Sequence, residues 1–317
     1  MTTRPFAAAT AAAVTAAAMA AIGVPSAGVA QSEGTGAPSR AELYRRHLLA
    51  GTDVPCRTNA SCAALGAEAL EAGRLDDAKA LIAMEAQLAD AASLEAADQN
   101  AWKAIVVAQA RAAMAFVHQG DLEVRLGAWT NARAYYRSAI GRGNDYPDDP
   151  SLARAVQLAR ARYQAIAHKS VIAGLPASGA RFERYLSPGA RDVVTLTPVK
   201  GRRGVYRIDG SFLDPVVSND GWPRANTGSV IAYLRFYDGV ARVPLAEGHN
   251  GTDAAPLDAT ARIADIGAAR RQRERCVIEF DLSAPETLDV VTHGPLVLCG
   301  FGLNVIADGR YYLKSGT

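Results

Sequence analysis

Two stretches of this 317-residue chain carry small residues at the same offsets, and this recurrence constrains the fold more than any other feature. The first stretch contains Gly66, Gly73, Leu75, Ala78 and Ile82, and the second contains Gly120, Gly127, Trp129, Ala132 and Tyr136. Glycine and alanine let two antiparallel helices approach closely, while the larger residue four positions after the alanine fills the groove beside it. Residues 62–140 therefore predict two helical hairpins, each turning at its second glycine.

These hairpins resemble degenerate tetratricopeptide repeats, a family of stacked helix pairs. The resemblance covers residues 62–140 and implies a helical module that packs against or recruits a protein partner. The spacing of the two hairpins departs from the family. Ala78 and Ala132 lie 54 residues apart, whereas each helix pair of a tandem array takes up about 34 residues. Cys62 stands at the aromatic position of the first unit, and Gln119 at the leucine position of the second. A regular superhelix with a peptide groove is therefore not expected.

The amino-terminal residues 1–30 predict a secretory signal peptide. Arg4 supplies the positive start, residues 6–22 form an alanine-rich apolar run, and residues 28–30 are small enough for cleavage. The alternative is a membrane anchor, but alanine is only weakly apolar and Thr10 and Thr15 interrupt the run. We expect an exported protein, periplasmic or secreted, with no stable membrane span after cleavage and a disordered tail at 31–38.

The four cysteines are interpreted in the light of export. In an oxidising compartment, pairing within each half is favoured among three connectivities, so Cys56 should bond Cys62 and Cys276 should bond Cys299. Zinc is the alternative, but neither pair has two-residue spacing. A catalytic Cys299 near His293 is a further alternative. We expect no metal and no cofactor.

Overall composition limits the classes of partner. Nearly half of the residues are apolar, enough for two domains with cores, and the formal net charge is only +2. A charge this small creates no strong field, so nucleic-acid binding is not expected. The basic run at 270–275 contains no aromatic residue that could stack on bases.

The helical domain should span residues 39–169. Ser39 with Glu42 has capping-box spacing, and Asp149 followed by Pro150 predicts the start of a last helix. An alanine-rich run at 97–119 predicts a long helix buried on more than one side. Residues 170–191 should form a linker, since 174–189 is rich in proline and glycine.

Beyond the linker, residues 192–317 predict an antiparallel β-sandwich or jelly roll. The expected strands are 193–199, 205–212, 230–237, 240–245, 276–282, 288–291, 296–298, 303–307 and 311–314. Asp238 and Gly239 predict a tight turn between two of them. Alternation in Cys276, Ile278 and Phe280 predicts a strand with one face in a core. The fold class is thus an α-helical domain followed by a β domain.

A polar loop at residues 218–229 is the candidate ligand site. It holds an indole beside planar hydrogen-bonding groups, a combination suited to a sugar ring: Asn219, Asp220, Trp222, Arg224 and Asn226. The alternative is an ordinary turn with Trp222 folded over the sandwich edge. Within residues 200–313, the runs 205–212 and 232–243 contain Tyr233, Phe236, Tyr237 and an Asp-Gly turn. These runs resemble strands of secreted carbohydrate-binding β-sandwiches, which implies a binding surface for a glycan or envelope polysaccharide.

A second polar loop at residues 246–260 carries Glu247, His249, Asp253 and Asp258. It could supply a general base, but its spacing does not fit a calcium loop, and a mobile polar loop is favoured. An envelope hydrolase centred on His249 or His293 remains an alternative. The interpretation favoured by the sequence is a non-catalytic exported binding or scaffold protein, with a helical module for a protein partner and a β module for docking.

Overall fold

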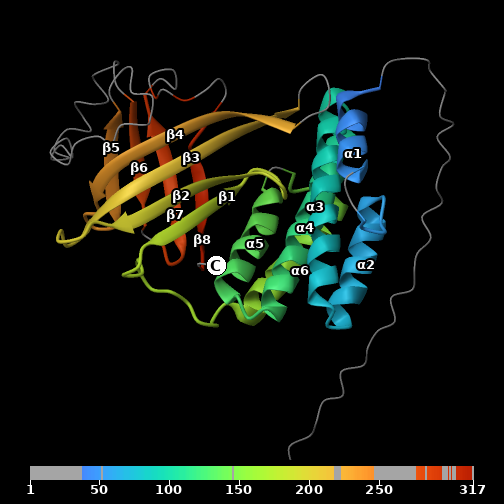
Figure 1. Cartoon of the computed structure of the whole chain (residues 1–317), viewed down its shortest axis with the longest axis horizontal. Helices are drawn as coiled ribbons and strands as arrows, with labels where there is room; N and C mark the ends of the chain where they lie inside the picture. Colours follow the sequence, from blue (N-terminus) through green and yellow to red (C-terminus); the bar gives the residue numbers. More distant parts are fainter. Residues whose placement is uncertain are drawn as a thin grey trace, which may run out of the picture. The chain divides into compact units, whose positions relative to one another are not determined.

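The computed structural model describes residues 38–50, 53–144, 146–217, 223–245, 276–282, 284–294, 299, 301 and 305–315. Within them, six helices precede one eight-stranded antiparallel sheet (Figure 1). The helices are α1 (Arg40–Ala50), α2 (Asn59–Glu71), α3 (Leu75–Asp98), α4 (Trp102–Arg125), α5 (Trp129–Arg142) and α6 (Pro150–Ile166). The strands are β1 (Ala180–Tyr185), β2 (Arg191–Pro198), β3 (Val205–Val217), β4 (Pro223–Arg235), β5 (Val240–Leu245), β6 (Cys276–Asp281), β7 (Thr287–His293) and β8 (Gly309–Lys314). The predicted order, helices first and strands second, is confirmed.

The helix starts follow the capping chemistry of the sequence. The Ser39 hydroxyl accepts the Glu42 N–H at 3.1 Å, and the Asp149 carboxylate accepts the Ser151 and Leu152 N–H groups at 3.0 and 2.9 Å. These bonds satisfy amide groups that have no partner inside the helix. The predicted starts of α1 and α6 are therefore confirmed.

The two helical hairpins share one packing contact at equivalent positions. Gly73 and Gly127 both turn with φ of +74°, a conformation that favours glycine. A Cβ atom added to Gly66 would meet Ile82 at 3.1 Å, and one added to Gly120 would overlap the Tyr136 ring. The bulky residue in the second helix of each hairpin thus packs directly on a glycine of the first.

The long helix predicted in the run at 97–119 is present as α4, but it begins only at Trp102. Helix α3 ends at Asp98, Asn100 adopts a positive φ of 47°, and α4 begins at Trp102. The break allows α3 and α4 to lie antiparallel instead of forming one long rod. Alanine favours helix on both sides, so composition alone concealed the turn.

The sheet has the strand order β4-β3-β2-β1-β8-β7-β6-β5. Its edge strands β4 and β5 are consecutive in the chain, joined by the predicted tight turn in which Asp238 and Gly239 have positive φ. The sheet must therefore curl until its edges approach each other, and its inner side encloses one apolar core. The expected sandwich of two packed sheets is not confirmed, since the eight described strands form a single continuous sheet.

Most strand predictions agree with the structure. Cys276, Ile278 and Phe280 face the core from β6, as their alternation predicted. Strand β1 lies inside the stretch 174–189 that was expected to be irregular, and this expectation was wrong, because β1 pairs with both β2 and β8. The expected strand 296–298 lies outside the described residues, and residues 305–307 form no strand.

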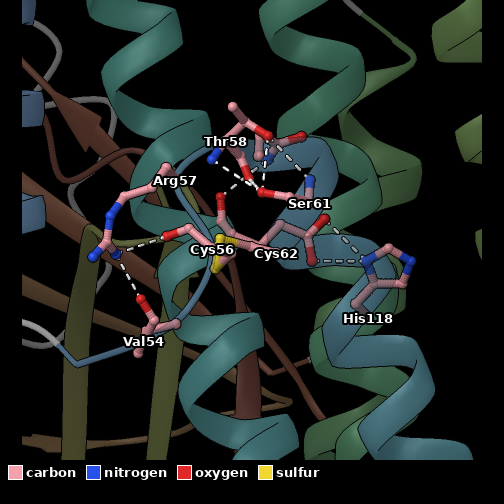
Figure 2. The surroundings of a disulfide bond; sticks show 9 residues. Val54, Cys56, Arg57, Thr58, Ser61, Cys62 and His118 are labelled. Carbon is pink, nitrogen blue, oxygen red and sulfur yellow. Dashed lines mark hydrogen bonds and ion pairs between the residues drawn. A yellow bond between two sulfur atoms is a disulfide. The ribbon is translucent and has the colours of Figure 1, made fainter.

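Both predicted disulfides are present. Cys56 bonds Cys62 at the start of α2, where Thr58 and Ser61 form a capping box (Figure 2), and Cys276 bonds Cys299 at the start of β6. The bond at Cys299 excludes a catalytic thiol there in this state. In the part of the chain that the structure describes, no helix has the length and apolar character needed to cross a bilayer.

Candidate functional site

A buried ion pair joins the helices to the sheet. Arg133 of α5 donates from Nε to Glu286 Oε2 at 2.7 Å and from Nη2 to Oε1, with side-chain exposures of 1% and 3%. The Ile172 N–H also donates to Glu286, at 3.1 Å. Burial by itself would raise the pKa of Glu286, but the bonds from Arg133 and Ile172 outweigh it and lower the pKa. Glu286 is thus a satisfied structural anion and not a free base.

A pocket of about 210 Å³ opens beside this ion pair. Its lining is mostly apolar and includes Leu175, Phe182, Leu282, Pro285 and Leu313. Among the described lining residues, Glu286 alone is ionisable, and Arg133 already engages that carboxylate. The pocket suits a small apolar group better than it suits polar chemistry.

Lys314 of β8 lies in an aromatic cluster between the sheet and α5. Its Nζ is 4.1 Å from the centroid of the Tyr135 ring and 5.8 Å from that of Tyr185. Nζ is buried and has no hydrogen-bond partner among the described residues. Burial lowers the pKa of Lys314 to about 8, although the charges of Glu123 and Glu183 oppose that shift. The Tyr135 and Tyr185 rings attract the Lys314 ammonium through cation–π contacts, which replace only part of the hydration that burial removes.

Asp90 of α3 forms a second polar contact to the sheet. Its Oδ2 accepts the Gly189 N–H at 2.8 Å, in the turn between β1 and β2. Its Oδ1 is buried and lacks a hydrogen-bond partner within the described residues. Burial raises the pKa of Asp90 to about 7, even though hydrogen bonds from Ser187 and Gly189 act in the opposite direction. This carboxyl therefore titrates near neutral pH.

Glu85 and His118 link α3 to α4. The Nδ1 atom of His118 lies 2.8 and 2.9 Å from the two Glu85 oxygens, and Figure 2 shows the imidazole beside the start of α2. Burial would lower the pKa of His118, but the Glu85 carboxylate and the charge of Asp121 raise it overall. A carboxylate at Nδ1 also orients imidazole in catalytic dyads. Helix α4 continues past His118 to Arg125, beyond the end at 119 that the sequence predicted.

The outer surface of α4 and α6 forms an exposed face beside His118. We define the α4–α6 face by one apolar residue between two cations on each helix, namely Lys103, Val107, Arg111, Arg154, Leu158 and Arg162. Val107 is 45% exposed and Leu158 is 36% exposed. Each apolar side chain is thus exposed between two cations of its own helix.

The candidate glycan residues are only partly described. Arg224 and Asn226 lie on β4, where the Asn226 Nδ2 donates to Asp214 Oδ2 of β3 at 3.1 Å. Asn219, Asp220 and Trp222 lie outside the described residues. A sugar site at residues 218–229 remains a prediction. The Asn226 amide of that site is already hydrogen-bonded to Asp214 across the β3–β4 hairpin.

The histidines proposed for a hydrolase are not shown together. His293 lies at the end of β7, where its buried Nε2 is 3.6 Å from Glu279 Oε2. His249 and the acidic residues of its loop, Glu247, Asp253 and Asp258, lie outside the described residues, as does the basic run at 270–275. Among the residues that are described, no group of three or more His, Cys, Asp or Glu side chains could hold a metal ion.

Sequence reasoning missed the charged groups at the contact between helices and sheet. Arg133 and Glu286 are 153 residues apart, and neither lies in a recognisable motif. Glu183, Asp90 and Lys314 likewise have no local pattern that separates them from solvated surface charges. Only the long-range packing of the chain brings these groups together.

Comparison with known protein families, curated proteins and solved structures finds no match to this chain.

Proposed function

We propose that this chain is an exported scaffold protein, in which the helical part binds a protein partner and the sheet docks at the cell envelope. The observation that carries the proposal is the buried Arg133–Glu286 pair, which fixes α5 to the sheet while the α4–α6 face stays exposed. A rigid mount of this kind holds a binding surface at a constant position.

Two further observations support this proposal. The equivalent contacts of Gly66 and Gly120 favour helical hairpins of a degenerate tetratricopeptide type. The two disulfides and the apolar run at 6–22 favour export to an oxidising compartment.

Site-specific photo-crosslinking in producing cells tests the partner. A photoreactive amino acid replaces Leu158 in the α4–α6 face or, as a control, Lys79 on the exposed side of α3. We expect a discrete protein adduct from position 158 and none of the same mass from position 79. Equal adducts from both positions, or none from 158, would contradict the proposed function.

Cell fractionation tests export. The mature chain is expected in the periplasmic or secreted fraction, with a mass that corresponds to a start near Gln31. Retention of the whole chain in the cytoplasm would contradict export.

A further inference from the structure

We propose that the α4–α6 face binds an acidic, amphipathic segment of a partner protein. The proposal rests on the proposed function and adds the chemistry of the partner. The supporting observation is the order of cations and exposed apolar residues along the adjacent helices α4 and α6. This surface is separate from the Arg133–Glu286 contact.

Each helix of the face repeats the same order of side chains. Lys103, Val107 and Arg111 follow one another at four-residue intervals on α4. Arg154, Leu158 and Arg162 do the same on α6. Residues four apart lie on one side of a helix, so each set forms a line of cation, apolar residue and cation about 12 Å long.

Contacts at both ends place the two lines on neighbouring helices that run in the same direction. The Trp102 ring packs edge to face with Tyr146, which precedes α6, at 5.1 Å between centroids. At the other end, Arg162 Nε lies 3.4 Å from Asp121 Oδ1 of α4. The charge of Arg162 also acts on the pKa of His118 of α4. Helices α4 and α6 are therefore neighbours, and the end of the α6 line lies beside Asp121, ten residues past Arg111 of the α4 line.

Three of the four cations of this face have no counter-charge among the described residues, and the fourth, Arg162, pairs with Asp121. Within the described residues, Lys103, Arg111 and Arg154 have no ion-pair partner. The nearby Asp121 already accepts a hydrogen bond from the Tyr136 hydroxyl at 2.6 Å and pairs with Arg162. An incoming carboxylate would meet uncompensated positive charge without competing against an acid of the protein itself.

The spacing favours a helical protein segment over other anionic partners. Glutamates four residues on either side of a leucine would match one line of the face, since the partner helix has the same periodicity. The apolar residues within the two lines are Val107 and Leu158, and the exposed Trp102 lies next to Lys103 at the end of the α4 line. A membrane surface would engage a broader apolar side than these residues provide. A polysaccharide would make no use of Val107 and Leu158.

Binding of synthetic peptides to the full mature chain tests the proposal. The probe is a helical peptide with Glu, Leu and Glu at four-residue spacing in an alanine background, and the reference peptide has Lys in place of Glu. The test variant is Arg111→Glu with Arg154→Glu. The matched control is Lys79→Glu with Arg160→Glu, which changes net charge equally at exposed positions outside the two lines.

We expect the test variant to weaken binding of the Glu peptide about tenfold or more, and the control variant to weaken it less than about twofold. The Lys peptide should not bind. Equal weakening by both variants would overturn the proposal, because net charge alone would then explain binding. Tighter binding to phosphatidylglycerol vesicles or to heparin than to the Glu peptide would also overturn it.

The crosslinking experiment separates this inference from the proposed function. Loss of the adduct at position 158 in the Arg111→Glu, Arg154→Glu variant supports an acidic partner. An adduct that persists unchanged in that variant overturns the acidic partner while the scaffold function stands.

Discussion

The buried charges at the contact between helices and sheet differ in how they are compensated. At α5, Arg133 and Glu286 satisfy each other with a two-point bond, and the pKa of Glu286 falls. At α3 and β8, Asp90 and Lys314 each retain a buried atom without a hydrogen-bond partner among the described residues. Burial then moves their pKa values to about 7 and about 8.

For Glu286, Asp90 and Lys314, the direction of the pKa shift depends on the bonds and charges around the buried group as well as on burial. A paired charge keeps its ionised form because the partner replaces the hydration it has lost. An unpaired charge loses that hydration without compensation, and the neutral form gains. The Arg133–Glu286 pair should therefore hold the helices and the sheet together over a wide pH range. Asp90 and Lys314 should make the free energy of unfolding depend on pH near neutrality.

The largest effect is expected from Glu286→Gln. This change leaves Arg133 buried without its counter-charge, so the free energy of unfolding at pH 7 should fall by about 3–5 kcal/mol in urea titration. Asp289→Asn is the control, because the Asp289–Arg310 pair is largely exposed and should contribute less than about 1 kcal/mol. Similar losses in the two variants would show that the buried pair has no special role.

Asp90→Asn should stabilise the protein at pH 8. Because the pKa of Asp90 is higher folded than unfolded, the folded state binds more protons between pH 3.8 and about 7, and stability falls as pH rises through that window. The variant should gain about 2–4 kcal/mol above pH 7 and almost nothing near pH 4. Urea titrations across this range provide the measurement, and a gain that does not change with pH would contradict the assignment.

Lys314→Met should also stabilise the protein, but over a different pH range. The pKa of Lys314 is lower folded than unfolded, so the unfolded state binds more protons between about 8 and 10.5 and wild-type stability rises there. The variant should gain about 1–3 kcal/mol at pH 7, and the gain should shrink by pH 10. A loss of stability at pH 7 would mean that the rings of Tyr135 and Tyr185 compensate the ammonium fully.

The smallest effect is expected from Arg142→Met. The positive charge of Arg142 lowers the pKa of Asp90, so its removal should raise that pKa further, by less than about one unit. Carboxyl carbon NMR of Asp90 measures the change directly, with Arg160→Met as an exposed control. A fall in the pKa of Asp90 would show that the turn at Gly189 had opened to solvent.

Local chemistry made much of the fold predictable. Capping by Ser39 and Asp149, alternation in β6 and the Asp238–Gly239 turn each depend on residues close in sequence. The disulfides were predictable because each cysteine has its partner in the same half. Strand β1 was missed because its place between β2 and β8 depends on residues more than a hundred positions away.

The sequence by itself determined the helical hairpins, most of the strands and the two disulfides, since periodicity, small residues and turn residues act over a few positions. Only the tertiary structure decided that the strands form one curled sheet, that Arg133 meets Glu286, and that Asp90 and Lys314 are buried without full compensation. The physical reason is that hydration of a charge depends on everything packed around it, and no local pattern records that packing.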